Sequence, residues 1–204
     1  MIETEATSSP VIAEADPRGA AVFAAVRSWP RSITVPFAVL LFALLTALSA
    51  RLSVPLGVTP VPMTLQTLAV LLAGALLGPV AGAASQLTYL ALGIAGVPVF
   101  AFGGAGLPWI FGATGGYLMA FPMAAMLTGW IAGRERGTAR TLSALVAGSV
   151  VIFAMGAAWL AVVTNMDLRA VFMAGVQPFL PGALIKIAIA FVVVRQAMTR
   201  GLLR

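Results

Sequence analysis

The chain contains no cysteine and no histidine among its 204 residues. Without cysteine it forms no disulfide, carries no thiol nucleophile and has no cysteine metal site. Without histidine it cannot perform serine–histidine hydrolysis, or hold zinc or haem through imidazole ligands. These absences exclude most classes of intramembrane enzyme. We predict that the chain is not an enzyme and that it uses no metal and no cofactor.

Charged residues are scarce as well. They make up 9% of the chain, against 61% hydrophobic residues, and the mean hydropathy is +1.05. A soluble domain does not have this composition. The sequence also lacks the glycine-rich phosphate-binding loop that would precede a lysine in an ATPase. We therefore predict an integral membrane protein that does not hydrolyse ATP itself.

Long apolar runs predict six transmembrane helices, because each approaches or exceeds the length needed to cross about 30 Å of hydrocarbon. A β-barrel would need alternating polar and apolar residues, and runs such as 68–77 have none. The fold class that we expect is an all-α integral membrane protein. Between the second and third runs, Gly78, Pro79 and Gly82 predict a tight turn. The six runs are 33–53, 65–80, 83–100, 115–132, 142–164 and 179–198.

The distribution of basic residues predicts the orientation. Nine of the twelve fall before the first run, between the fourth and fifth, or in the last ten residues, at the end of the sixth run and beyond it. By the positive-inside rule, both termini are then cytoplasmic. Residues 1–17 contain acidic but no basic residues, unlike the start of a signal peptide. We expect a cytoplasmic tail at 1–32, disordered at its start, and one transmembrane domain at 33–204. The partners we expect include the lipid bilayer but no nucleic acid.

Lys186 is the only lysine, and it lies within an apolar run. It precedes Arg195 by nine residues, so a helix places it ~14 Å from that charged end, near the middle of the membrane. An ammonium there costs roughly 2.5 to 3.5 kcal/mol unless it meets a partner, water or a ligand. The alternatives are a lysine that extends to the interface or pairs within the bundle. We favour a ligand site.

Two further segments contain residues suited to the same site. The proline-rich segment 54–67 ends with Thr64 and Gln66, although these residues could instead be a helix N-cap and a first-turn residue. The glycine-rich segment 96–117 includes Phe100 and Tyr117, which could form apolar walls. An aromatic belt at the membrane interface is the alternative for this segment, and we favour it for Trp109.

The third apolar run contains Gln86 and Tyr89, which could face the interior of the bundle. Taken singly, each is as well explained by helix packing. Gln177 lies just before the prolines that start the last helix, and those prolines set the helical backbone that carries Lys186.

Four stretches together resemble the BioY family, the biotin-binding S components of energy-coupling-factor (ECF) transporters. The resemblance extends from about residue 35 to 191. It implies an S-component-like bundle in the cell membrane that captures biotin from outside. The implied partners are a coupling subunit and two ATPases, or further copies of the chain where no energising module is used. The stretches are 60–67 (PVPMTLQT), 89–101 (YLALGIAGVPVFA), 112–117 (GATGGY) and 178–186 (PFLPGALIK).

The resemblance also bears on partner docking. S components typically carry small residues on the first helix for contact with the coupling subunit, and Ala43 and Ala47 offer such a face. Ordinary packing within the chain is the alternative.

The chain departs from the family pattern at Ala183, where the family usually has an aspartate. Positions 183 and 186 share a helix face, so the aspartate and lysine of the family would point into one pocket. Without the aspartate, one ureido N–H of biotin loses its acceptor, which costs about 1 to 3 kcal/mol. Either the chain binds biotin more weakly, or another acceptor such as Gln177 or Gln86 substitutes.

Two other functions remain open. The S-component fold is used for several ligands, so the chain could bind another small vitamin. It could also be a structural membrane subunit that binds nothing. The structural alternative predicts that side chains close the space around Lys186.

Overall fold

The computed structural model describes residues 30–133 and 137–200. The chain divides into two units, Met1–Thr34 and Val35–Arg204. In the first unit, the described part is the short stretch 30–34, in which the helix α2 (Arg31–Arg51) begins. The predicted tail therefore lies almost wholly outside the described residues, and the second unit contains the elements that form the fold.

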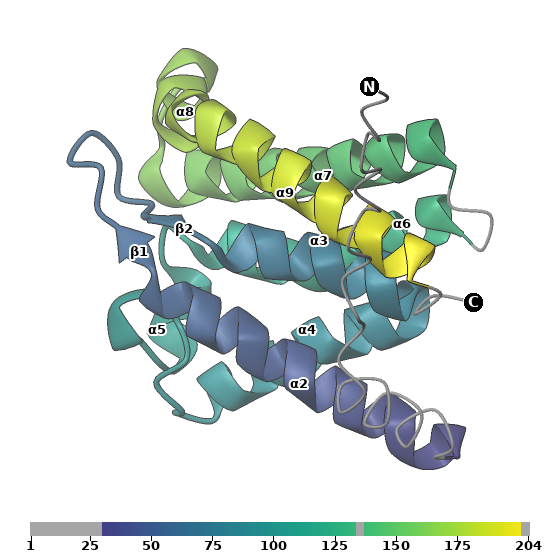
Figure 1. The fold of residues 1–204 in the computed structure, drawn as a ribbon. Coiled ribbons are helices and arrows are strands. Elements are labelled where there is room, and N and C mark those ends of the chain that lie inside the picture. The colour runs from purple at the N-terminus through teal and green to yellow at the C-terminus, as the bar shows by residue number, and fades with distance from the viewer. Residues whose placement is uncertain (1–29, 134–136, 201–204) are drawn as a thin grey trace, which may run out of the picture. The chain divides into compact units, whose positions relative to one another are not determined.

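The second unit is a bundle of helices (Figure 1). Between the long helices lie short elements: a two-stranded antiparallel hairpin with Ser53 opposite Thr64, and several short helices. The long helices are α2 (Arg31–Arg51), α3 (Gln66–Leu77), α4 (Pro79–Ile94), α6 (Gly115–Ala132), α7 (Thr138–Thr164) and α9 (Leu180–Thr199). The short elements are β1 (Ser53–Val54), β2 (Met63–Thr64), η1 (Ala101–Gly103), α5 (Leu107–Phe111), α8 (Leu168–Gly175) and η2 (Gln177–Phe179).

The prediction of a helical membrane protein is confirmed. Within the described residues, four stretches are long and apolar enough to cross a membrane: Arg31–Arg51, Gly115–Ala132, Thr138–Thr164 and Leu168–Thr199. The α3 helix has only 12 residues, about 18 Å at 1.5 Å per residue, and α4 has 16. The count of six spans therefore stays a prediction.

The boundaries of the third predicted run were wrong. The helix begins at Pro79 and ends at Ile94, instead of extending over 83–100. The break before it is a single residue, Gly78, whose φ of 85° suits glycine and ends α3. At the other end, Gly96 has a φ of 97° and Pro98 follows, so the chain leaves the helix. Residues 95–100 become irregular backbone that returns toward the centre of the bundle.

Glycines allow α3, α4 and α6 to pack very closely. A Cβ at Gly82 would lie 2.9 Å from the Cα of Gly74, and one at Gly129 would lie 2.5 Å from the backbone of Gly78 and Pro79. Real Cβ atoms do not approach backbone this closely. Small residues at such crossings are typical of membrane helices, which associate through close packing.

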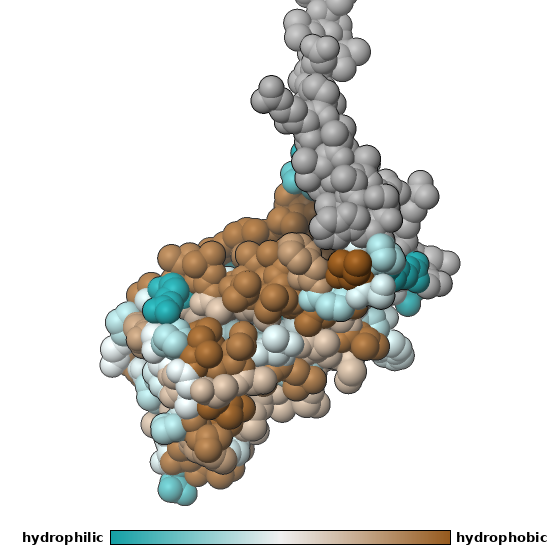
Figure 2. Space-filling view, turned by 90° about the horizontal axis from the view of Figure 1, so that it is seen from below, coloured by the Kyte–Doolittle hydropathy of each residue, from teal (hydrophilic) through white to brown (hydrophobic). Residues whose placement is uncertain are grey.

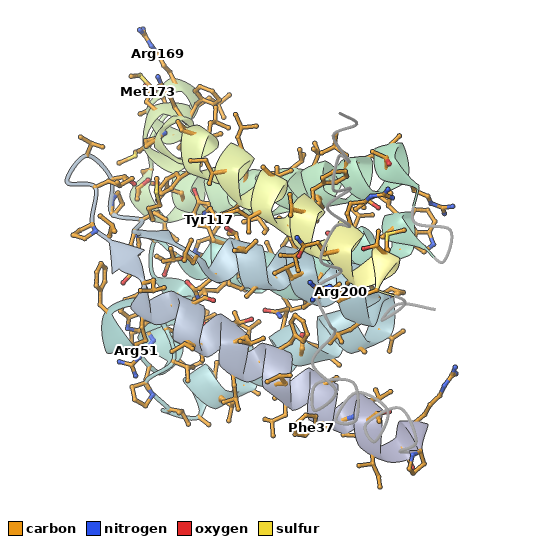
Figure 3. The ribbon with its side chains drawn as sticks, viewed as in Figure 1. Phe37, Arg51, Tyr117, Arg169, Met173 and Arg200 are labelled. Atoms are coloured by element: carbon orange, nitrogen blue, oxygen red, sulfur yellow. The ribbon has the colours of Figure 1, made fainter. Side chains whose placement is uncertain are left out.

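The outer surface is apolar. Figure 2 shows hydrophobic side chains over much of the face seen from below. Large apolar residues are exposed on several helices, among them Leu48 on α2, Trp130 on α6 and Leu184 on α9. Such a surface suits contact with lipid. Arg51 and Arg169 lie at the hairpin end of the bundle and Arg200 lies toward the opposite end (Figure 3).

We expect Gly129→Ala to destabilise the protein, because the new methyl group would overlap the backbone where α3 meets α4. Overpacking of this kind costs about 1 to 3 kcal/mol. The measurement is the melting temperature of the purified chain in detergent. Met126→Ala, at an exposed position of the same helix, is the control and should melt near the unmodified chain. Equal melting of the Gly129→Ala variant and the unmodified chain would contradict close packing at this crossing.

Candidate binding cavity

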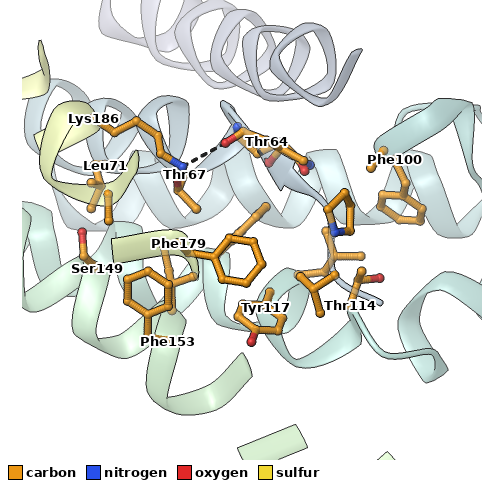
Figure 4. Close-up of a pocket in the computed structure, with 18 of the residues that line it drawn as sticks. Thr64, Thr67, Leu71, Phe100, Thr114, Tyr117, Ser149, Phe153, Phe179 and Lys186 are labelled. Atoms are coloured by element: carbon orange, nitrogen blue, oxygen red, sulfur yellow. Dashed lines mark hydrogen bonds between the residues drawn. The ribbon is translucent and has the colours of Figure 1, made fainter. Parts of the chain in front are cut away.

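A cavity lies inside the bundle, between α3, α6, α7 and α9, with about 760 Å³ of empty space including the part that is open to solvent. Figure 4 shows its lining. Residues from β2, η1, α5 and η2 complete the wall, so the segments 54–67, 96–117 and the start of α9 meet here. The lining residues are Val61, Pro62, Thr64, Gln66, Thr67, Leu71, Phe100, Ala101, Trp109, Thr114, Tyr117, Leu118, Phe121, Ser149, Ile152, Phe153, Phe179, Ala183 and Lys186.

Lys186 is the charged group of this lining. Its side chain is only 8% exposed, and its Nζ donates a hydrogen bond to the backbone oxygen of Thr64 at 2.9 Å (Figure 4). The lysine therefore does not extend to an interface. An ammonium has three N–H donors, and in the described part of the chain this is the one acceptor that it meets.

No carboxylate of the described residues lines the cavity. Among residues 30–133 and 137–200 the one acidic residue is Asp167, which caps α8 by accepting a hydrogen bond from the backbone N–H of Ala170 at 2.7 Å. The ammonium of Lys186 therefore faces a space without a described counter-ion. A positive charge in such surroundings favours a ligand that brings a negatively charged or strongly polar oxygen.

The polar side of the cavity near β2 contains a short chain of hydrogen bonds. The side-chain amide of Gln66 donates to the hydroxyl of Tyr89. That hydroxyl donates to the backbone oxygen of Val99 at 3.2 Å. The backbone N–H of Gln66 donates to Oγ1 of Thr64 at 3.3 Å. Gln66 thus lies beside the residue whose carbonyl holds Lys186.

Aromatic rings form the apolar walls, and glycines on neighbouring segments make room for them. The ring of Phe100 occupies the space where a side chain on Gly93 would stand, and the ring of Tyr117 lies in the same way over Gly156. Tyr117 also donates a hydrogen bond to the backbone oxygen of Gly175 at 2.7 Å. These contacts hold the two rings in place.

Five of the predicted site residues line the cavity together: Lys186, Thr64, Gln66, Phe100 and Tyr117. The N-cap alternative for Thr64 does not describe α3, whose N-cap is Leu65 and has no side-chain cap. Gln66 is the first residue of α3 and also lines the cavity.

Three predicted site residues do not line the cavity. Tyr89 has no exposed surface and lies behind Gln66 and Phe100, with its ring edge-to-face against Phe100 at 5.6 Å. Gln86 bonds to Thr46 of α2 at 3.3 Å and to Ser85 at 3.0 Å. Gln177 is exposed in η2. A role in ligand contact for these three residues is untested, and their positions do not support it.

Several lining residues were not anticipated. Trp109 lines the cavity, although an interface belt was the favoured interpretation. Ser149, Ile152 and Phe153 come from α7, where the apolar run gave no sign of which face is inside. Phe179 packs into the core just before α9. The run contains two serines, Ser143 and Ser149, and only Ser149 lines the cavity.

The predicted docking residues on α2 lie partly inside the protein. Ala43 has no exposed surface and belongs to the main core cluster, and Ala47 is half-buried against that cluster. These positions fit the alternative of packing within the chain. Their contact with a partner stays an untested prediction.

The fold and the cavity together define a class: a multi-pass helical membrane protein that encloses a site for a small molecule. Comparison with known proteins makes the class more specific. The model of the BioY family matches residues 21–202. The chain belongs to the BioY family.

Similar proteins support this assignment. A probable biotin transporter BioY from Pyrococcus horikoshii is 43% identical over 155 residues, covering 76% of this chain and 90% of the relative. The biotin transporter BioY of Rhizobium etli is 34% identical over 165 residues, covering 76% and 88%. A crystal structure described as the S-component for biotin from an ECF-type ABC transporter matches with a TM-score of 0.77 at 27% identity, covering 83% of this chain and 93% of that one. The fold is therefore that of an ECF S component.

We expect Gly156→Ala to destabilise the protein through Tyr117, because the added methyl group would overlap the tyrosine ring. The expected cost is about 1 to 3 kcal/mol. In a Tyr117→Ala background the ring is gone, and the same substitution should cost much less. Unfolding of the two single variants and the double variant in detergent measures this coupling. Additive effects would show that the glycine does not position the ring.

Proposed function

We propose that this chain is the substrate-binding S component of a biotin uptake system. The observation that carries the proposal is the open cavity beside Lys186. The ammonium of Lys186 is buried there, and no carboxylate of the described residues is its partner. A structural subunit that binds nothing would have this space filled by side chains. The relatives named as biotin transporters support biotin as the ligand.

The cavity offers complementary chemistry for each part of biotin. Its aromatic walls suit the apolar, sulfur-containing ring, because burial of such surface is favourable. Lys186 supplies a charged donor for an oxygen of the ligand, and hydrogen bonds to charged groups are stronger than neutral ones. Biotin has candidate oxygens in two groups, its carboxylate and its ureido group.

The transport cycle and topology form part of the same proposal. The chain spans the membrane six times, with α3 and α4 as the two short spans and both termini in the cytoplasm. For transport, the chain works with a coupling subunit and two ATPases that supply the energy, or it associates with further copies of itself. The opposite placement of Arg200 relative to Arg51 and Arg169 supports this orientation (Figure 3).

We expect Lys186→Met to weaken biotin binding at least tenfold, because the ligand loses its charged donor. Isothermal titration calorimetry on the purified chain in detergent measures the change. Ile189→Met introduces the same side chain at an exposed position three residues along the helix, and it should bind biotin normally. If Lys186→Met bound biotin as tightly as the unmodified chain, Lys186 would not be a ligand contact.

Biotin methyl ester assigns the oxygen that Lys186 contacts. If this oxygen belongs to the carboxylate, the ester should bind the unmodified chain as weakly as biotin binds Lys186→Met. If it belongs to the ureido group, the ester should bind nearly as well as biotin.

We expect Ala183→Asp to tighten biotin binding. Ala183 lines the cavity, so an aspartate there would supply an acceptor for a ureido N–H that is otherwise unpaired. An unpaired buried donor costs about 1 to 3 kcal/mol, or roughly one to two decades of affinity. Ala183→Leu, which adds volume without an acceptor, should not tighten binding. If Ala183→Asp left the affinity unchanged, the view of a weakened site would be wrong.

If no biotin binding were found with either the unmodified chain or Ala183→Asp, the proposal of biotin as ligand would fail. The chain would then be an S component for another small vitamin, or a subunit without a ligand. Screening of other small vitamins by thermal shift would separate these two alternatives.

A further inference from the structure

We propose that Tyr89, which does not line the cavity, fixes the side-chain amide of Gln66 so that its oxygen is the hydrogen-bond acceptor for one ureido N–H of biotin. This inference rests on the proposed function. It makes Gln66 a ligand contact and Tyr89 a positioning residue.

A backbone carbonyl sets the direction of the hydrogen bonds. The oxygen of Val99 can only accept, so the hydroxyl of Tyr89, at 3.2 Å, donates its single proton to it. The oxygen of Tyr89 is then left to accept from Gln66. The group of Gln66 that faces Tyr89 is therefore its NH₂, in agreement with the observed Nε2 contact. The chain of donors orients the amide before any ligand binds.

The consequence is an acceptor without a protein partner. The Oε1 atom of Gln66 meets no donor in the part of the chain that the structure describes, although Gln66 is only 4% exposed. A buried polar atom without a partner costs free energy. Because Gln66 lines the cavity, a ligand N–H can satisfy this oxygen.

The neighbours of Gln66 strengthen the match to a ureido group. Thr64 links Gln66 to Lys186, because its Oγ1 accepts from the Gln66 N–H and its backbone oxygen accepts from Lys186. An acceptor and a charged donor therefore lie on one side of the cavity. A cyclic urea presents N–H donors next to a carbonyl oxygen, which is the complementary pattern.

The position of Gln66 gives the cavity one acceptor, although the aspartate of the family pattern is missing. Gln177 and Gln86, the substitutes expected from the sequence, do not line the cavity. Gln66 does, and it retains one acceptor where Ala183 provides none. A ureido group has two N–H donors, so one is satisfied by Gln66 and the other is the one that Ala183→Asp would serve.

The test compares biotin with its two lactam analogues, in each of which CH₂ replaces one ureido N–H. Calorimetry in detergent gives the affinity of each compound for the unmodified chain, Gln66→Leu, Tyr89→Phe and the double variant. We expect Gln66→Leu to weaken biotin at least tenfold and Tyr89→Phe to weaken it about fivefold. One of the two lactams lacks the N–H that donates to Gln66. This lactam should bind all four proteins with the same affinity.

In the double variant, Tyr89→Phe should add nothing to the effect of Gln66→Leu on biotin affinity, because it acts through that residue. Thr128→Val is the matched control. The hydroxyl of Thr128 is also buried, and it donates a hydrogen bond to the backbone oxygen of Ala144 at 3.3 Å. Thr128 does not line the cavity. Thr128→Val should lower the melting temperature as Tyr89→Phe does and leave biotin affinity within about twofold.

Three results would overturn the inference. Equal weakening of biotin and both lactams by Tyr89→Phe would show a general structural role for the tyrosine. Unchanged biotin affinity in Gln66→Leu would show that the amide is not a contact. If the unmodified chain did not bind biotin at all, the proposed function would fail and the inference with it, whereas the first two results leave the proposed function intact.

Discussion

The contact between Lys186 and the backbone of Thr64 is the interaction on which the site depends. It joins the last helix to the strand just before α3, beside a cavity that is lined by aromatic rings and by several uncharged polar side chains. A buried ammonium must be surrounded by acceptors, or its desolvation is not offset. Here the described part of the protein supplies one backbone oxygen as acceptor, and the other N–H donors of the ammonium are left for the cavity. The same charge therefore holds β2 in place and attracts an oxygen of a ligand.

Close backbone packing gives that charge a rigid setting. The α3, α4 and α6 helices meet at glycines, where a side chain would overlap the backbone of the neighbouring helix. Further glycines at 93 and 156 receive the rings of Phe100 and Tyr117. The walls of the cavity are thus held by residues that never touch its interior. In membranes, where apolar surface has little to gain from leaving lipid, this packing is a main source of helix association.

Hydrogen bonds behind the wall determine which polar atoms the cavity presents. Tyr89 has no surface in the cavity, yet its bond to Val99 decides that Gln66 turns its NH₂ away. Thr46, Ser85 and Gln86 form a separate buried group that joins α2 to α4. Arg51 adds a second link from α2, through the backbone oxygen of Pro98 at 2.8 Å. The sequence contains all these side chains, but only their arrangement separates a ligand contact from a support.

Composition and apolar run length alone determined the class of this protein, because so few charged residues cannot cover the surface of a soluble domain. The lone lysine in an apolar run likewise indicated the site, since a charge at that depth requires a partner. The tertiary structure decided what such local patterns do not contain: where the third helix stops, which face of α7 points inward, and that Gln66 rather than Gln86 or Gln177 reaches the cavity. These outcomes depend on contacts between segments far apart in the chain, and the direction of the Gln66 amide depends on a carbonyl 33 residues away.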